Sequence, residues 1–399
     1  MTPERAVIVG ASHAGAQLAA NLRREGWSGE VVLIGDEGGL PYHRPPLSKG
    51  YLAGKNGLDD LLIRGADFYE KQHIRLLNAT VEAIHRSAKR VSLSTGDTLT
   101  YTKLALCTGA RARRLPTPGV DLPGIHYLRT AADVELIRAA ATPGRRVVIV
   151  GGGYIGLETA ASLCSLGMNV TVLEATERVL ERVTAPEVSA FYTRIHNGEG
   201  VEIRTHALVE AFFGNGGVQE VVLADGEPIP ADLVIVGVGV VPNTELASAA
   251  GLSVDNGIVI DDQARTSDPD IVAAGDCTSH TMARYGSRIR LESVSSAGEQ
   301  AKIAAATICG KHSAIAALPW FWSDQYDLKL QIAGLNAGYD EVLLSGDPSR
   351  ERDFSCFYFR EGELIAADCV NRPRDFMSSK RAISQQLRVD RSELLAGSI

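Results

Sequence analysis

The chain carries the same phosphate-binding pattern twice, about 140 residues apart. In each copy a run of mostly β-branched residues is followed by small residues and the start of a helix. Such a turn brings backbone N–H groups and a helix N-terminus up to a pyrophosphate. The copies are Ala6-Val7-Ile8-Val9-Gly10-Ala11-Ser12-His13-Ala14-Gly15 and Val147-Val148-Ile149-Val150-Gly151-Gly152-Gly153-Tyr154-Ile155-Gly156. Two copies predict two dinucleotides in one chain, and electron transfer between them is the simplest chemistry for such a pair.

Each copy has an acidic partner after its second strand, where a carboxylate accepts hydrogen bonds from ribose hydroxyls. Asp36 and Glu37 stand there in the first unit, and Glu174 ends Val170-Thr171-Val172-Leu173 in the second. A carboxylate at this position repels a 2′-phosphate, so the second site should favour NAD(H) over NADP(H). Ser12 replaces the middle glycine of the first copy, which narrows the approach to the pyrophosphate. The alternative is a pair of nucleotide folds of which one has lost its ligand.

The pattern of elements predicts an α/β protein with two Rossmann-like dinucleotide-binding domains, glutathione-reductase-like in arrangement, and a C-terminal α+β domain. We expect the loop from Asp36 to Lys49 to be rigid and non-helical because of its consecutive prolines. Ser296 and Glu299 have the spacing of a capping box at the start of a helix of roughly 15 residues. The predicted domains are 1–114 with 244–317, then 115–243, then 318–399.

Composition sets broad limits on the class of protein. The 399 residues carry a net charge of −8, so no basic surface for nucleic acid dominates the chain. No apolar run approaches the roughly 20 residues of a membrane helix, and the N-terminus has no signal-peptide pattern. The six cysteines are scattered without a CxxC pair, which is typical of free thiols in the cytoplasm. No metal-ligand spacing occurs among the nine histidines.

Several further motifs resemble one family along essentially the whole chain. They are Pro41-Tyr42-x-Arg44-Pro45-Pro46-Leu47-Ser48-Lys49, Thr108-Gly109-Ala110-Arg111, Gly275-Asp276, Glu292-Ser293-Val294 and Trp320-Phe321-Trp322-Ser323-Asp324-Gln325. Through them the sequence resembles the FAD-dependent NADH:ferredoxin reductases of the putidaredoxin reductase group, which includes the reductase components of P450 and aromatic-ring dioxygenase systems.

The resemblance implies FAD in the first domain and NADH in the second. Gly10, Ala14 and Gly15 would meet the FAD pyrophosphate, Asp36 the ribose and Val81 the adenine, while Arg44 and Arg129 would hold the charged middle of the cofactor. Asp276 would bind the ribitol, and Val294 would offer its N–H to the flavin pyrimidine edge. Ser12, Thr108, Gly109 and Trp320 complete the expected FAD set. The expected NADH set is Gly151, Gly153, Tyr154, Ile155, Gly156, Glu158, Glu174 and Gly239.

Lys49 and Glu158 are the expected catalytic pair. In the family these two positions pair beside the flavin, where they could orient the nicotinamide and balance charge during hydride transfer. Hydride transfer between cofactors asks the protein mainly for positioning. A surface lysine and an unrelated helix-face glutamate are the alternative.

Disulfide reductases of this architecture place a redox cysteine pair after the first nucleotide unit, but the segment from Pro41 to Lys49 contains no cysteine. Electrons must therefore leave the flavin by another route, and the resemblance implies that the acceptor is a [2Fe-2S] ferredoxin that serves a cytochrome P450 or a ring-hydroxylating dioxygenase. A rubredoxin reductase and a redox-sensing protein like apoptosis-inducing factor are the alternatives. Two basic clusters could dock the acceptor: Arg284, Arg288 and Arg290, or Arg372, Arg374, Lys380 and Arg381.

Overall fold

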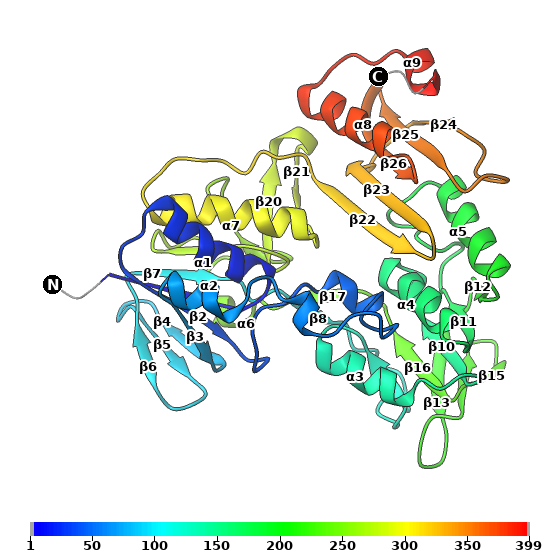
Figure 1. The fold of residues 1–399 in the computed structure, drawn as a ribbon, viewed down its shortest axis with the longest axis horizontal. Coiled ribbons are helices and arrows are strands. Elements are labelled where there is room, and N and C mark those ends of the chain that lie inside the picture. Colours follow the sequence, from blue (N-terminus) through cyan, green and yellow to red (C-terminus); the bar gives the residue numbers. More distant parts are fainter. Residues whose placement is uncertain (1–3, 397–399) are drawn as a thin grey trace. The chain divides into compact units, whose positions relative to one another are not determined.

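The computed structural model describes residues 4–396. They form two folding units, each assembled from separated stretches of sequence (Figure 1). Unit 1 contains the chain up to His43, Asp59–Arg111 and Val241–Pro319. Unit 2 contains Arg44–Leu58, Ala112–Val240 and the chain from Trp320 onward. This grouping follows compactness rather than ligand binding, so the predicted division into three domains stays a prediction.

Unit 1 is built on a five-stranded parallel sheet in the order β19-β7-β1-β2-β3. The first predicted βαβ unit is confirmed, since β1, α1 and β2 follow one another and β1 pairs with β2. Buried β-branched residues fill the sheet, as expected for parallel strands that are covered on both faces. The bounds are β1 Arg5–Val9, β2 Glu30–Gly35, β3 Ile74–Asn78, β7 Lys103–Leu106 and β19 Ile271–Ala273.

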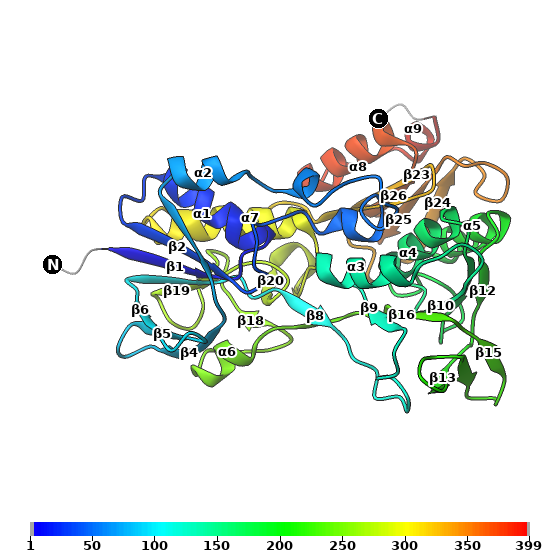
Figure 2. The same cartoon turned by 60° about the horizontal axis from the view of Figure 1, so that its bottom comes forward.

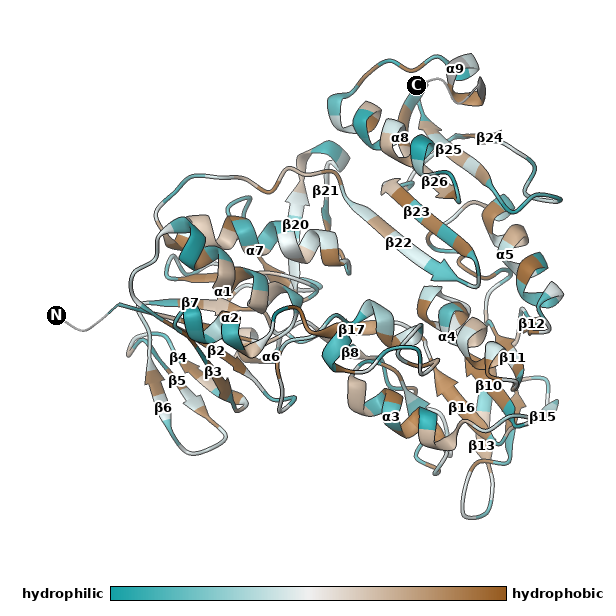
Figure 3. Cartoon of the chain, viewed as in Figure 1, coloured by the Kyte–Doolittle hydropathy of each residue, from teal (hydrophilic) through white to brown (hydrophobic). Residues whose placement is uncertain are grey.

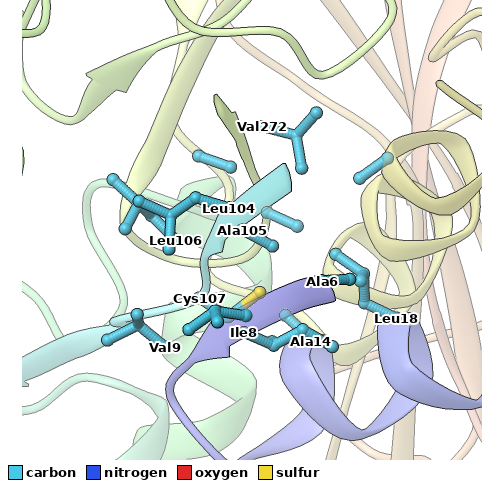
Figure 4. Close-up of a cluster of buried hydrophobic side chains, with 14 of the residues drawn as sticks. Ala6, Ile8, Val9, Ala14, Leu18, Leu104, Ala105, Leu106, Cys107 and Val272 are labelled. Atoms are coloured by element: carbon cyan, nitrogen blue, oxygen red, sulfur yellow. The ribbon is translucent and has the colours of Figure 1, made fainter. Parts of the chain in front are cut away.

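Two helices, α1 (His13–Glu25) and α7 (Val294–Ile308), lie side by side over one face of this sheet (Figure 2). Ile8 of β1 and Leu18 of α1 are fully buried where helix and sheet meet, whereas Leu104 of β7 is fully buried on the opposite face of the sheet (Figure 4). Small sheets and short helices complete unit 1: β4 Val81–His85, β5 Arg90–Leu93, β6 Thr98–Thr100, β18 Ile258–Val259, β20 Thr278–Met282, β21 Ser287–Ile289, α2 Ala66–Lys71 and α6 Glu245–Ala249.

Unit 2 repeats the design with a parallel sheet in the order β12-β11-β10-β16-β9. The interior strand β16 is fully buried and appears brown in the hydropathy view (Figure 3). The glycine-rich segment Gly214–Gly217, whose composition is typical of a hairpin turn, joins the antiparallel strands β13 and β14. The bounds are β9 Ile125–Tyr127, α3 Ala131–Ala140, β10 Arg146–Val150, α4 Tyr154–Ser165, β11 Asn169–Leu173, α5 Pro186–Gly198, β12 Glu202–Arg204, β13 Val209–Phe213, β14 Glu220–Leu223, β15 Pro228–Pro230 and β16 Leu233–Val236. Strands β8 Ala110–Ala112 and β17 Val240–Pro242 pair with each other where the chain passes between the units.

The C-terminal part of unit 2 is an antiparallel sheet in the order β22-β23-β26-β25-β24, with α8 packed on β26 and β23. Its strand β22 also contacts α4, the helix of the second nucleotide pattern. The bounds are β22 Trp320–Gln325, β23 Leu328–Gly334, β24 Glu341–Ser345, β25 Phe354–Arg360, β26 Glu363–Val370, α8 Pro373–Gln385 and α9 Arg391–Ala396. The expected α/β class with a C-terminal α+β region is confirmed. Within residues 4–396, no helix combines the length and apolar character that crossing a membrane requires.

The expectation of a non-helical loop before Lys49 is wrong in one respect. Pro45–Ser48 forms a short 3-10 helix with the prolines in its first turn. Proline is well suited to that position, because its fixed φ matches the helix and its missing N–H would have no partner there. The rigid element that precedes Lys49 is therefore a helical turn.

A buried acid ties the C-terminal sheet to α5. The Tyr358 hydroxyl donates to Asp368 Oδ2 at 2.5 Å and accepts from the Ala185 N–H, just before α5, at 3.0 Å. Asp368 is 1% exposed, and burial raises its pKa to about 7 because the charged form loses its hydration. The carboxyl group of Asp368 therefore takes up its charge near neutral pH in the folded protein.

This shift predicts a loss of stability with rising pH. The folded protein keeps the Asp368 proton up to about pH 7, whereas the unfolded chain releases it at lower pH. Stability is therefore highest below the unfolded pKa and declines by about 1.4 kcal/mol per pH unit between the two pKa values. We expect Asp368→Asn, which retains an acceptor for Tyr358, to unfold at a higher temperature than the parent at pH 8, with a smaller advantage at pH 5. Exposed Asp121→Asn is the control, and a pH-independent difference for Asp368→Asn would contradict the assignment.

Candidate active site

The first phosphate-binding turn needs glycine at two places for steric reasons. Gly10 has φ +107°, and a Cβ there would come within 2.0 Å of the Cys107 carbonyl oxygen. A Cβ on Gly15 would come within 1.9 Å of the Gly10 carbonyl oxygen. These contacts let α1 begin directly against the end of β1. Ser12 is the N-cap residue, and the helix begins at His13, followed by Ala14.

The second turn repeats this geometry in unit 2. Gly151 has φ +110°, and a Cβ there would lie 2.4 Å from the Gly237 carbonyl oxygen. A Cβ on Gly156 would lie 2.1 Å from the Gly151 carbonyl oxygen. Gly153, the N-cap of α4, faces open space, with no other part of the chain within 4 Å of a Cβ built there. The missing side chain at Gly153 therefore leaves room for a ligand instead of relieving a clash within the chain.

Both turns fit the pyrophosphate of a dinucleotide. The Ser12 side chain makes no capping hydrogen bond to α1, the N-cap of α4 is a glycine, and neither helix has an acidic residue in its first turn. The positive end of each helix is thus left for a bound anion. The residues present fit FAD in unit 1 and NADH in unit 2.

The acidic partners lie where the sequence predicts, after the second strand of each unit. Asp36 follows β2 and is exposed. Glu174 follows β11, and its carboxylate accepts from the N–H of Gly152 at 2.8 Å and from the N–H of Thr176 at 2.9 Å. The Glu174 charge is therefore fixed beside the second turn.

The Gly275–Asp276 turn is held against α1 and α7. Gln300 of α7 accepts from the Gly275 N–H at 2.7 Å, and a Cβ on Gly275 would lie 3.0 Å from the Ala14 Cβ. The structure thus brings Asp276 to the N-terminal end of α1.

The predicted capping box at Ser296 and Glu299 is wrong. The N-cap of α7 is Ser293, whose hydroxyl accepts from the Ser296 N–H at 3.2 Å, and Val294 is the first helical residue. Glu299 instead accepts from the N–H groups of Ala316 and Ala317. The error arose because Ser293 also has the type and position of a cap, three residues earlier.

The remaining residues of the predicted FAD set lie in both units. Thr108 and Gly109 are held by Asn243, which accepts from the Thr108 hydroxyl at 2.6 Å and donates its own N–H to Gly109 at 2.9 Å. Val81 begins β4. In unit 2, Arg44 donates to the Arg129 carbonyl oxygen at 2.8 Å.

Three further predicted site residues lie in two elements of unit 2: Tyr154 and Ile155 begin α4, and Trp320 begins β22. The Tyr154 ring packs on Phe321 with a centroid separation of 4.9 Å, and Ile155 is exposed. Trp320 stacks on Trp322 at 5.5 Å, with the Lys380 ammonium 4.7 Å from the Trp320 ring. Gly239 has φ +93° and accepts from the Arg113 N–H.

Lys49 and Glu158 form an ion pair in unit 2. The Lys49 Nζ lies 2.8 Å from Glu158 Oε2 and also donates to the Pro45 carbonyl oxygen at 3.1 Å. Their side chains are 19% and 4% exposed. A carboxylate that is this deeply buried needs both a countercharge and hydrogen-bond donors.

Two serines supply those donors, and the sequence did not single them out. Ser48 donates to Glu158 Oε2 and Ser323 donates to Oε1, each at 2.6 Å. Both residues lie within family motifs, and Ser48 directly precedes Lys49, so the motifs themselves were the available signal. The link from Ser323 to Glu158 spans 165 residues, and no local pattern encodes it.

The cysteines show no sign of disulfide chemistry. All six are free thiols, and Cys107 is buried at the end of β7. Burial raises the pKa of the Cys107 thiol well above its usual value, which disfavours the reactive thiolate. Among the described residues 4–396, no cluster of three or more His, Cys, Asp or Glu side chains could hold a metal ion.

The two turns, their acids and the Lys49–Glu158 pair define an oxidoreductase that binds two dinucleotides. The chain belongs to the pyridine nucleotide-disulphide oxidoreductase family, whose model matches residues 4–301, and a second model, described as reductase C-terminal, matches 320–398.

Known relatives agree with this family along nearly the whole chain. Putidaredoxin reductase CamA of Pseudomonas putida is 47% identical over 394 residues, which cover 97% of this chain and 93% of the relative. The ferredoxin–NAD(+) reductase component of the anthranilate 1,2-dioxygenase system from Burkholderia cepacia is 42% identical over 397 residues, 99% of this chain and 97% of that protein. A crystal structure of the covalent putidaredoxin reductase–putidaredoxin complex matches with a TM-score of 0.95 and 45% identity, covering 99% of each chain. The predicted resemblance is thereby confirmed.

A substitution at Lys49 separates a role in chemistry from a role in cofactor retention. In Lys49→Met the buried Glu158 carboxylate loses its countercharge, and no ammonium group remains to hold the carboxylate in position. We expect flavin reduction by NADH to slow about tenfold or more, as misplaced groups do at other active sites, while FAD is still retained. Stopped-flow bleaching of the reconstituted protein measures the rate, with Lys55→Met, an exposed lysine on the same segment, as the control. Loss of FAD with normal kinetics after reconstitution would make Lys49 structural.

Proposed function

We propose that this chain is an NADH-dependent ferredoxin reductase that works in the cytoplasm. It takes hydride from NADH onto FAD and passes electrons one at a time to a [2Fe-2S] ferredoxin that serves a cytochrome P450 or a ring-hydroxylating dioxygenase. The observation that carries the proposal is the combination of two phosphate-binding turns with the buried Lys49–Glu158 pair. The relatives' names support the acceptor, and six free thiols agree with a reducing compartment.

In this proposal the N-terminus of α1 holds the FAD pyrophosphate and that of α4 holds the NADH pyrophosphate. Asp36 and Glu174 bind the two adenosine riboses, and Val81 lies against the FAD adenine. Arg44 and Arg129 hold the charged middle of FAD. When bound, FAD accepts two electrons as hydride and releases them singly.

The remaining residues orient the reacting ends of the cofactors. Asp276 binds the ribitol, and the Val294 N–H at the positive end of α7 stabilises negative charge on the flavin pyrimidine. Lys49 and Glu158 orient the nicotinamide, and Trp320 lines the flavin. No side chain needs to act as an acid or base in the hydride step.

Each of the two basic clusters is a candidate docking surface for the ferredoxin. In unit 1, Arg288 lies 3.3 Å from Asp255 and Arg290 lies 2.6 Å from Glu292. In unit 2, Arg372 lies 3.0 Å from Asp353. These acidic neighbours reduce the positive potential that either cluster presents to an acidic partner.

Anaerobic electron transfer tests the function as a whole. NADH should bleach the bound flavin, and two equivalents of an oxidised [2Fe-2S] ferredoxin, each accepting one electron, should restore the flavin colour of the reduced protein. A parallel experiment uses a rubredoxin in place of the ferredoxin, and faster reoxidation by the rubredoxin would favour the rubredoxin reductase alternative. Reoxidation by the ferredoxin that is no faster than reoxidation in buffer would contradict the proposal.

Glu174 predicts the nucleotide preference. Its fixed carboxylate beside the second turn would repel the 2′-phosphate of NADPH. Arg178, which could otherwise attract that phosphate, donates to the Thr184 carbonyl oxygen, the Glu181 carbonyl oxygen and the Ser189 hydroxyl. NADH should therefore bleach the flavin much faster than NADPH.

We expect Glu174→Ala to narrow the difference between the two nucleotides. The exposed neighbour Glu177→Ala is the control, and the ratio of flavin reduction rates with NADH and NADPH is the measurement. An unchanged ratio in Glu174→Ala would place the discriminating residue elsewhere.

A further inference from the structure

A row of buried polar side chains continues from Glu158 into the interior of unit 2. Ser323 and Gln325 are two residues apart on β22 and are 0% and 1% exposed, and His196 of α5 is 0% exposed. Gln325 Nε2 lies 3.2 Å from Ser323 Oγ, His196 Nε2 lies 2.8 Å from Gln325 Oε1, and the Tyr326 hydroxyl lies 3.0 Å from His196 Nδ1. With the 2.6 Å contact from Ser323 to Glu158, these bonds form one continuous row.

Such a row is unusual because buried positions of a strand are normally apolar. Residues two apart on a strand share one face, so Ser323 and Gln325 both point into the interior. A buried polar group without a partner destabilises the folded chain. Every member of this row has a partner, so the row is a fully satisfied network that ends at the ion pair.

The charge at Glu158 sets the direction of every hydrogen bond in the row. A carboxylate only accepts, so the Ser323 hydroxyl must donate to it, and Ser323 can then only accept from the Gln325 amide NH₂. The Gln325 carbonyl oxygen consequently faces His196, which must donate from Nε2. His196 Nδ1 is left to accept from the Tyr326 hydroxyl. The opposite direction would aim lone pairs of Ser323 at the buried carboxylate.

The surroundings of His196 agree with a neutral ring that has its proton on Nε2. Burial lowers the pKa of His196, although its bond to Gln325 acts in the opposite sense. The Gln325 amide cannot readily pass a proton along the row. The row therefore orients groups and does not conduct protons.

We propose that Ser323, Gln325 and His196 are positioning residues for the Lys49–Glu158 pair: their one-directional row of donors fixes the Glu158 carboxylate and, through it, the Lys49 ammonium. The role of that pair in hydride transfer rests on the proposed function. The direction of the row is a property of this chain alone and can be tested without the reaction.

The first test measures which ring nitrogen of His196, at the end of the row away from Glu158, carries the proton. In ¹⁵N-histidine-labelled protein, His196 should show its proton on Nε2; its signal is identified by its loss in His196→Asn. In Glu158→Gln the new carbonyl must face Lys49 and Ser48, so the new NH₂ faces Ser323 and donates to it. Every later bond then reverses, and the proton of His196 should move to Nδ1. A proton on Nδ1 in the parent, or an unchanged proton on Nε2 in Glu158→Gln, would overturn the proposal.

The second test breaks the row in the middle. Gln325→Met keeps the approximate shape but removes both amide contacts, and stopped-flow reduction by NADH should be about tenfold slower, with apparent NADH affinity changed less than twofold, as expected for lost positioning. Asp324→Asn, a more exposed neighbour on β22, is the control and should reduce at the parent rate.

The outcomes distinguish this proposal from the proposed function. Failure of NADH to reduce the flavin of the parent would refute the function. Normal reduction of the parent together with an equally fast Gln325→Met would refute the positioning role alone. Should Gln325→Met not fold, the histidine signals of Glu158→Gln still decide the direction of the row.

Discussion

The burial of one negative charge organises unit 2. Glu158 is 4% exposed, and a carboxylate with so little contact with water must have its charge and its lone pairs satisfied by the chain. Three separate segments meet to do this: the Pro45–Ser48 turn with Lys49, helix α4 with Glu158 itself, and strand β22 with Ser323. The Ser162 hydroxyl of α4 also donates to the Ser48 carbonyl oxygen at 2.7 Å, which holds the turn against the helix. The segment Arg44–Leu58 belongs to unit 2 although its sequence neighbours on both sides belong to unit 1.

A second constraint, the close approach of backbone to backbone, explains why the two nucleotide turns look alike. Gly10 lies against the carbonyl oxygen of the residue that follows β7, and Gly151 lies against the carbonyl oxygen of the residue that follows β16. In both cases the third glycine of the pattern lies against the carbonyl oxygen of the first. These are local steric requirements, and they leave the amide-rich ends of α1 and α4 for an anion. The middle position of the second turn, Gly153, faces open space, so a side chain at this position does not clash within the chain. Ser12 occupies the equivalent position of the first turn.

Local requirements of this kind are what the sequence predicts well. Both βαβ units, the β13–β14 turn and the return of β19 to the first sheet follow from β-branched runs, glycines and turn residues. The sequence did not decide correctly between two neighbouring candidates for a helix cap: Ser296 was expected to cap α7, but Ser293 is its N-cap. Contacts at long sequence separation were out of reach unless a family motif pointed to them. Lys49 and Glu158 were paired in this way. Ser323 was given no role, and the residues of the buried row through Gln325 and His196 are not spaced in any pattern that the sequence alone would reveal.

The segments that surround Glu158 also constrain how the chain is made. Ser323 follows Glu158 by 165 residues, so at a synthesis rate of roughly 5–20 residues per second Glu158 is incorporated into the chain about 8–33 s before Ser323. While those 165 residues are made, Glu158 of helix α4 already has Lys49 in the chain but lacks its Ser323 donor. Unit 2 can be completed only at the end of synthesis, because it includes the chain from Trp320 onward. A chain cut short before β22 leaves the Glu158 carboxylate without its Ser323 donor.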